Sequence, residues 1–112
     1  MKVGGNVIAC TISKRYADRY CPYWYAYHPS WDDFLLEEPR SLFVLGCTDQ
    51  PFSFAIPWKV IHGVLDSLNT TTTEKSKYWH LNVAEPQPGK FELLLPKSST
   101  NLSLEEFKMK LT

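Results

Sequence analysis

Runs of apolar residues, either continuous or alternating with polar ones, predict six β-strands. Asn6–Ser13 is rich in β-branched residues and follows two glycines, which is typical of a strand. Ser41–Cys47 is a continuous apolar run bounded by turn residues, so we expect a strand in the middle of a sheet. The other expected strands are Tyr23–His28, Phe52–Ile56, Tyr78–Ala84 and Lys90–Leu95.

Helical spacing predicts a first helix over 31–38. Trp31, Phe34 and Leu35 lie at positions i, i+3 and i+4, so they would form one apolar face. Ser30 followed by Asp33 resembles a capping arrangement that would start this helix, and a proline at position 39 would stop it. We expect this helix to pack on a sheet.

Two further helices are expected. Pro57–Leu68 has apolar residues at helical spacing and a proline suited to the first turn of a helix. Near the C-terminus, Ser103 and Glu106 resemble a capping box for a short helix that ends at Leu111. The polar segment 69–77 lies between elements and is expected to be a surface loop.

The order of the elements predicts an α+β domain. Short turns join most neighbouring strands, so the sheet should be mostly antiparallel. We expect a bent sheet of about six strands, with two or three helices packed on one face. At 112 residues the chain is expected to be one domain, residues 1–112, which is either complete or a fragment of a longer chain.

Charge and cysteine content narrow the function classes. The net charge is zero, so nothing attracts the whole molecule to nucleic acid or to an anionic membrane. No segment reaches 18 consecutive apolar residues, and no signal peptide is visible, so we expect a cytoplasmic protein with no membrane partner. The three cysteines are an odd number without paired spacing, which fits a reducing compartment.

A cluster of cations and aromatics suggests nucleic-acid binding. Lys14, Arg15 and Arg19 lie just before Tyr23 and Trp24, and bases stack on aromatic rings beside a basic groove. DNA or RNA is therefore one expected partner. The alternative is that the alternating aromatics belong to the core and that the cations are merely solvated.

Cys47 is the best candidate for nucleophilic catalysis, because it ends a predicted strand and a histidine elsewhere in the chain could activate it. The alternative is a buried cysteine that acts as a small apolar residue. The histidines and cysteines lack the close paired spacing of a zinc site, and no glycine-rich phosphate loop is present. We therefore expect neither a metal nor a cofactor.

The longer motifs are YWYAYHPSWDDFL, FVLGCTDQ, FAIPWKVIHGVLDSLNTT, YWHLNV and FELLLPK. Together they resemble a domain of uncharacterised bacterial proteins with Tyr-Trp, His-Pro, Gly-Cys, Ile-Pro, Asn-Thr-Thr and Tyr-Trp-His motifs. Such domains occur in restriction-like or other DNA-directed contexts. The resemblance implies that the two aromatic strands pair, with His28 and His80 facing one pocket beside Trp24 or Trp79.

These observations favour a non-catalytic module that recognises nucleic acid or a partner chain within a larger bacterial DNA-directed protein. The nucleic-acid site would use Lys14, Arg15, Arg19, Tyr23 and Trp24. The pocket would contain His28, Cys47, Trp79 and His80. Two alternatives stay open: a small enzyme domain that uses a Cys/His pocket, and a structural domain that dimerises through an exposed strand.

Overall fold

The computed structural model describes residues 2–3, 6–17, 21–37 and 40–110. Within these residues, one five-stranded sheet has the order β1-β2-β4-β5-β10. Its strands are β1 (Lys2–Val3), β2 (Asn6–Ser13), β4 (Leu42–Cys47), β5 (Phe52–Pro57) and β10 (Lys108–Lys110). β2 and β4 run parallel, with Ile8 opposite Leu42, whereas the neighbouring pairs in this sheet are antiparallel.

The second sheet is antiparallel and is organised around one long strand, β7. In the described part of the chain it has the order β3-β7-β8-β9, with β6 also paired to β7. Its strands are β3 (Tyr23–Tyr27), β6 (Thr70–Thr72), β7 (Lys77–Gln87), β8 (Lys90–Leu93) and β9 (Leu102–Ser103). β7 is long enough to pair with β6 near its start and with β8 near its end.

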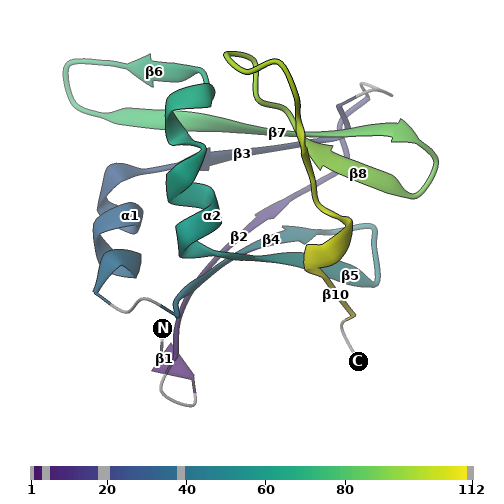
Figure 1. Ribbon diagram of the computed structural model, residues 1–112, viewed down its shortest axis with the longest axis horizontal. Coiled ribbons are helices and arrows are strands. Elements are labelled where there is room, and N and C mark those ends of the chain that lie inside the picture. The colour runs from purple at the N-terminus through teal and green to yellow at the C-terminus, as the bar shows by residue number, and fades with distance from the viewer. Residues whose placement is uncertain (1, 4–5, 18–20, 38–39, 111–112) are drawn as a thin grey trace.

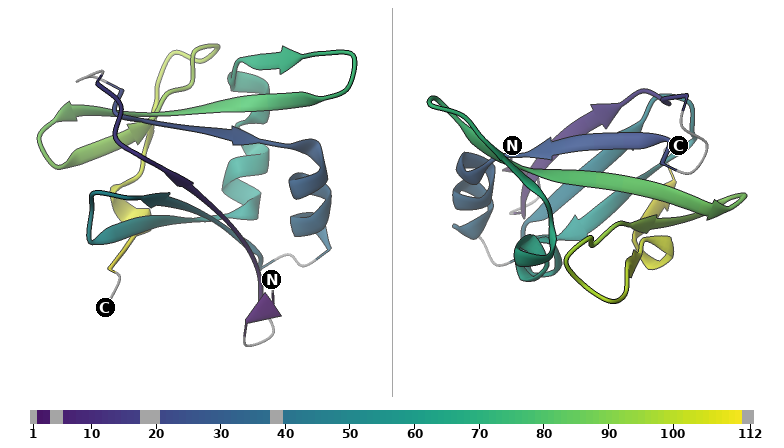
Figure 2. Two further views of the ribbon diagram at one scale, coloured as in Figure 1. Left: turned by 180° about the vertical axis from the view of Figure 1, so that it is seen from behind. Right: turned by 90° about the horizontal axis from the view of Figure 1, so that it is seen from above.

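The sheets lie as two layers, and helices close one side between them (Figure 1). The helices are α1 (Pro29–Leu36) and α2 (Trp58–Gly63), and short 3₁₀ turns follow at η1 (Leu65–Ser67) and η2 (Glu105–Phe107). Seen from above, the strands of one layer cross those of the other at an angle (Figure 2). A mixed α/β fold with few helices follows, as the order of elements predicted.

The core lies between the two sheets and is rich in aromatic residues. Because side chains alternate along a strand, Tyr23, Tyr25 and Tyr27 all point inward from β3, and each is almost completely buried. Phe43 and Leu45 of β4 face them from the other sheet and are buried as well. The tyrosines of the aromatic strand therefore serve mainly as core.

The prediction of one bent sheet is wrong, because the strands form two sheets. The parallel pairing of β2 with β4 was also not foreseen. Between these two strands the chain passes through β3 of the other sheet and through α1 before it returns as β4. The short strands β1, β6, β9 and β10 carry too few residues for an apolar period to identify them.

The predicted C-terminal helix is not formed. The segment instead contains β9, a 3₁₀ turn and β10. The Leu104 amide donates to the Phe91 carbonyl at 3.0 Å, and the Leu104 side chain is buried in the core. Tertiary contacts with β8 and β5 thus override the local helical spacing. The predicted loop at 69–77 likewise contains β6.

Both helices inside the domain differ from their predicted bounds. α1 begins at Pro29, with His28 at the N-cap position and no side-chain cap, so Ser30 does not cap it. Leu35 is buried as expected, but Phe34 is 38% exposed. α2 ends at Gly63, before the predicted end of the helix.

Candidate functional site

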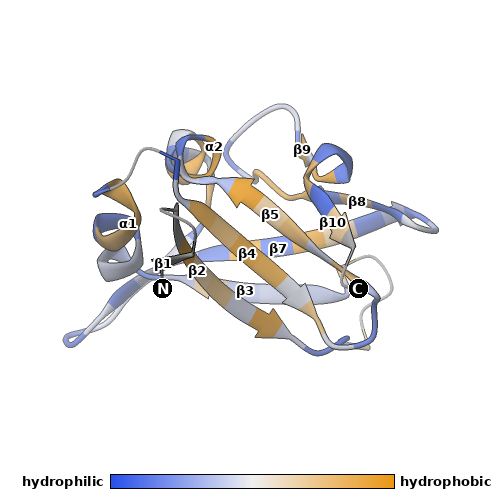
Figure 3. Cartoon of the chain, turned by 90° about the horizontal axis from the view of Figure 1, so that it is seen from below, coloured by the Kyte–Doolittle hydropathy of each residue, from blue (hydrophilic) through white to orange (hydrophobic). Residues whose placement is uncertain are grey.

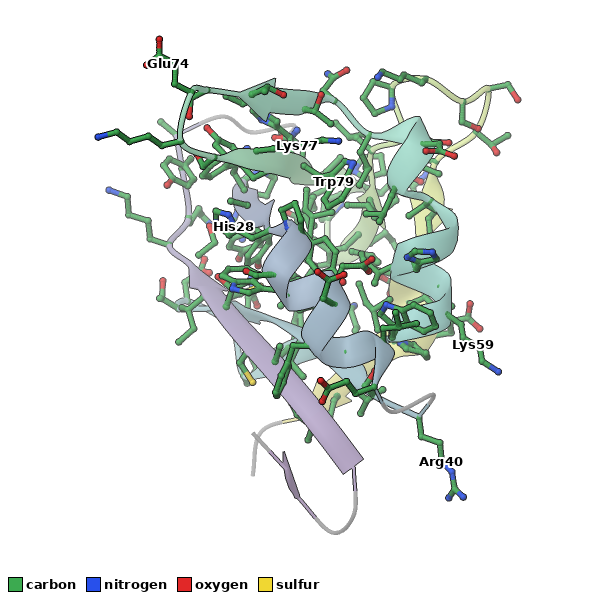
Figure 4. All side chains as sticks on the ribbon, turned by 90° about the vertical axis from the view of Figure 1, so that its left-hand side faces the viewer. His28, Arg40, Lys59, Glu74, Lys77 and Trp79 are labelled. Atoms are coloured by element: carbon green, nitrogen blue, oxygen red, sulfur yellow. The ribbon has the colours of Figure 1, made fainter. Side chains whose placement is uncertain are left out.

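An apolar groove lies between β2 and α1. Ile8, Ala9 and Cys10 line one wall, Trp31 and Phe34 line the other, and the cavity has a volume of about 410 Å³. Figure 4 shows β2 running diagonally beside α1 on this side of the molecule. None of the lining residues is charged, so the groove suits an apolar group.

The groove exists because the end of β2 lies beside the start of β3 and the two strands diverge away from that point. The Tyr16 amide donates to the Pro22 carbonyl at 2.8 Å, and the Trp24 amide donates to Ser13 Oγ at 3.3 Å. Beyond these contacts β2 joins β4 in one sheet, whereas β3 joins β7 in the other. The diverging strands leave an opening, and α1 forms its far wall.

The outer edge of β2 is open over part of its length. The Thr48 amide donates to the Ser13 carbonyl at 3.1 Å, so the backbone groups of Ser13 face β4. Because these groups alternate between the two edges of a strand, Cys10 and Ile12 present theirs to the opposite edge. There the described residues of β1 pair with Asn6 and Val7. Among the described residues, no hydrogen bond reaches Cys10 or Ile12 from that edge.

The sheet surface next to this edge is also apolar. Cys10 and Ile12 lie opposite Val44 and Gly46 of β4, and the Ile12 side chain is 71% exposed. Figure 3 views this sheet from below and shows that apolar residues make up much of β2, β4 and β5. We name the β2 edge at Cys10 and Ile12, together with the groove, the β2–α1 site.

A cluster of rings covers the outer face of the second sheet near the start of α1. The rings belong to Trp24, His28, Tyr78 and His80. Trp24 Nε1 donates to His80 Nδ1 at 3.3 Å, so His80 Nε2 carries the ring proton and donates to Thr71 Oγ1 at 2.6 Å. The His28 ring lies 5.7 Å from the Tyr78 ring, centroid to centroid. We name these residues the outer aromatic cluster.

The outer aromatic cluster brings together some of the residues that the sequence analysis expected to face one pocket. The predicted pairing of the aromatic strands is confirmed, because β3 pairs with β7. His28, Trp24 and His80 come together on one face, joined by Tyr78, which the sequence did not single out. Trp79 lies on the opposite face of β7, 5.9 Å from the Tyr27 ring, because adjacent strand residues point to opposite faces.

Cys47 lies apart from the histidines of the outer aromatic cluster. It is 6% exposed, and its Sγ lies 3.4 Å from the Tyr25 hydroxyl, inside the core. Burial raises the pKa of the Cys47 thiol, and the hydrogen bond with Tyr25 offsets this only in part. The thiol is therefore protonated at neutral pH, and this supports the alternative of a buried apolar cysteine.

The predicted basic site is not assembled as a free surface. Arg15 donates to carboxylates of Asp49 and Glu85 and to the Tyr23 hydroxyl. Tyr23 is 0% exposed, so neither face of its ring is available to a base. The Lys14 ammonium lies 5.5 Å from the centre of the Tyr16 ring. Arg19 lies outside the described residues.

The electrostatics of this network explain why Arg15 is held. The pKa of Asp49 is lowered: burial acts to raise it, but the hydrogen bonds from Arg15 and Tyr23 outweigh that effect. The pKa of Arg15 is raised, chiefly by its hydrogen bond to Asp49. This network connects the β4–β5 turn to the other sheet through Tyr23 and through Glu85 of β7.

Asp32 organises a second polar network that sequence reasoning missed. Its carboxylate accepts hydrogen bonds from the Tyr27 hydroxyl at 2.9 Å, from Trp58 Nε1 at 2.9 Å and from His62 Nδ1 at 3.0 Å. The His62 ring stacks on Trp58 with centroids 4.7 Å apart. The network joins β3, α1 and α2. Only the short Trp58–His62 spacing on the helix could have indicated it.

The described residues contain no group of three or more His, Cys, Asp or Glu side chains placed to hold a metal ion. Nor does any helix in that part of the chain have the length and apolar character needed to cross a membrane.

Comparisons with known proteins give no indication of the function. No family model, no curated protein and no solved structure matches the chain. The resemblance to bacterial domains with Tyr-Trp and His-Pro motifs therefore stays a prediction. The β2–α1 site and the outer aromatic cluster are the surfaces on which a function can be proposed.

Proposed function

We propose that the protein is a non-catalytic recognition module that binds a partner chain at the β2–α1 site. The observation that carries this proposal is the apolar groove beside an open strand edge. Surfaces of this kind cost free energy when they face water, and they mark interaction sites in many proteins. The exposure of Ile12 and Phe34 beside the groove supports a partner with apolar side chains.

The side chains that could perform catalysis support a binding role rather than an enzymatic one. Cys47 is buried and hydrogen bonded to Tyr25. Both ring nitrogens of His80 form hydrogen bonds, and His62 binds Asp32 across α1 and α2. These groups stabilise the fold, and they lie away from the groove.

A selection from a random peptide library tests the proposal. We expect selected peptides to shift the NMR signals of β2 and α1. Phe34→Asp should weaken binding by more than about tenfold, because Phe34 lines the groove. Leu36→Asp is the matched control, since Leu36 is an exposed apolar residue of the same helix that does not line the groove. Peptides that map elsewhere, or equal effects of both variants, would contradict the proposal.

The outer aromatic cluster favours a second candidate function, the binding of single-stranded nucleic acid. Trp24 is 36% exposed, and a base could stack on it, in keeping with the DNA-directed context that the resemblance implies. Lys14 would supply a phosphate contact. Anisotropy of labelled single-stranded DNA across a salt series tests this candidate: binding should weaken steeply with salt and be reduced by Trp24→Ala. Indifference to DNA at low salt would remove it.

A further inference from the structure

We infer that the partner binds the β2–α1 site as an added β-strand, paired with the open edge of β2. This inference deepens the proposed function and depends on it. The groove alone would also accept a helix or a loop. The open backbone groups of Cys10 and Ile12 distinguish among these occupants, because only an extended chain can satisfy them along with the groove.

The spacing of the open backbone groups matches a strand. Cys10 and Ile12 each present one N–H and one C=O to the same edge, two residues apart, which is the repeat of a β-ladder. β1 limits the edge at Val7, and β3 approaches it at Ser13. A partner strand of about four residues, roughly 13 Å long, would fill the part of this interval from Ala9 to Ile12.

The edge lacks the features that usually prevent strand addition. Exposed edges in soluble proteins carry lysine, proline, a bulge or an inward-pointing charge. Between Ile8 and Ser13, β2 has no charged residue and no proline, and its register with β4 is continuous. An unprotected edge of this kind is a hazard unless a partner covers it, so the edge itself favours a binding role.

The groove determines the side chains of the partner. In an added strand, alternate side chains would point over Ala9 toward Trp31 and Phe34. A charged side chain there would lose its hydration without a pairing group, so these positions require large apolar residues. The intervening side chains would lie beside Ile12 on the outer face of the sheet. The expected ligand is therefore an extended segment with large apolar residues at every second position.

A second copy of this chain fits the edge less well. Antiparallel pairing of β2 with β2 of another copy would bring Ala9 and Thr11 of that copy to the groove side. Both are too small to fill a cavity of about 410 Å³. A different chain with larger side chains satisfies both the edge and the groove.

N-methylation of a library-selected peptide, one amide at a time, tests the inference without altering the protein. Amides that face β2 should lose about tenfold in affinity when methylated, whereas the intervening amides should change less than about twofold. This alternation identifies an added strand. A peptide that maps to the groove but shows no alternation would overturn the inference and leave the proposed function standing. If no peptide maps to the groove, both are overturned.

Measurements on the protein give an independent test. Peptide binding should slow amide hydrogen exchange at Cys10 and Ile12 by about tenfold or more, and unchanged exchange there would overturn the inference. Cys10→Pro removes one open N–H and should bind about tenfold more weakly than the matched variant Cys10→Ser, which also lacks the thiol but keeps that N–H. If Cys10→Pro does not fold, the exchange result decides. A dimer that the peptide dissociates would assign the edge to a second copy instead.

Discussion

Asp32 connects a strand and two helices through one carboxylate. Tyr27, Trp58 and His62 all donate to it, and the Tyr27 side chain is completely buried. We expect Asp32→Ala to lower the free energy of unfolding by about 3 kcal/mol, because it leaves the buried Tyr27 hydroxyl and the partly buried Trp58 Nε1 without an acceptor. Urea unfolding measures the change. Asp33→Ala, at an exposed neighbouring position, should cost less than about 0.5 kcal/mol; equal losses for the two variants would contradict this role for Asp32.

The cysteines differ in reactivity because of their surroundings. Cys10 is exposed on β2, whereas Cys47 is buried and burial raises the pKa of its thiol. N-ethylmaleimide should modify Cys10 in the native protein and should modify Cys47 only after unfolding. Peptide mass spectrometry of samples labelled with and without urea measures both. Rapid native labelling of Cys47 would revive the alternative of an enzyme with a Cys/His pocket.

At the scale of elements, period and composition predicted the long strands well. The structure has strands at Asn6–Ser13 and at Leu42–Cys47, where the sequence pattern predicted them. The pattern failed where an element is held by distant contacts. Thr70–Thr72 becomes a strand only because β7 extends past β8 and offers an edge. The local sequence of this polar, threonine-rich segment contains no information about the length of its partner strand, β7.

In the C-terminal segment, too, distant contacts rather than local sequence determine the structure, and two neighbouring glutamates allow this to be tested. Glu106 was the expected helix cap, but Glu105 carries the contacts: its carboxylate accepts from the Phe91 amide at 2.8 Å and pairs with Lys108 at 2.9 Å. Glu105→Ala should lower the free energy of unfolding by about 1 to 2 kcal/mol, since the Phe91 amide loses its acceptor. Glu106→Ala, at an exposed position, should stay within about 0.5 kcal/mol in urea unfolding. A larger loss of stability for Glu106→Ala than for Glu105→Ala would contradict this assignment and favour the expected capping role of Glu106.

At the scale of the whole molecule, the two sheets are held together on opposite sides. The helices and the Asp32 network close one side, and the network of Arg15, Tyr23, Asp49 and Glu85 links the sheets at the β4–β5 turn. Figure 1 shows α1 and α2 on one side of the molecule and this turn on the other. The sequence indicated two of these residues, Arg15 and Tyr23, as candidates for binding, because a cation near tyrosines looks the same whether it is solvated or paired. Arg15 is paired because Asp49 and Glu85 lie beside it. These two residues are distant from Arg15 in sequence and become its neighbours only when the sheets pack.

The open edge of β2 could also not be predicted from the sequence. The apolar run Asn6–Ser13 predicts a strand but not its neighbours. Parallel pairing with β4 places β2 near the edge of the sheet, and the divergence from β3 leaves the groove uncovered. By contrast, the proximity of His28, Trp24 and His80 was predictable, because the pairing of the two aromatic strands determines it.

Two carboxylates with lowered pKa values, those of Asp49 and Glu105, predict how the free energy of unfolding depends on pH. In the folded protein the pKa of Asp49 lies below its ordinary value of 3.8 and that of Glu105 below 4.5. In each case burial acts to raise the pKa, and the hydrogen bonds of Asp49 with Arg15 and of Glu105 with the Phe91 amide outweigh it. A carboxylate with a lowered pKa in the folded state stabilises that state fully above its unfolded pKa. This stabilisation is lost as the pH falls through the folded value.

We therefore expect the urea midpoint of the wild type to fall as the pH decreases below about 4.5, the region where unfolded carboxylates begin to take up protons. The double variant Asp49→Asn/Glu105→Gln should be less stable at neutral pH and should lose less stability on acidification, because neither side chain can then bind the proton. Urea unfolding at several pH values between neutral and acidic conditions measures both slopes. Glu106→Gln, which removes an exposed carboxylate close in sequence, is the control and should keep the wild-type dependence. Parallel curves for the wild type and the double variant would show that Asp49 and Glu105 do not couple protonation to the closure of the two sheets.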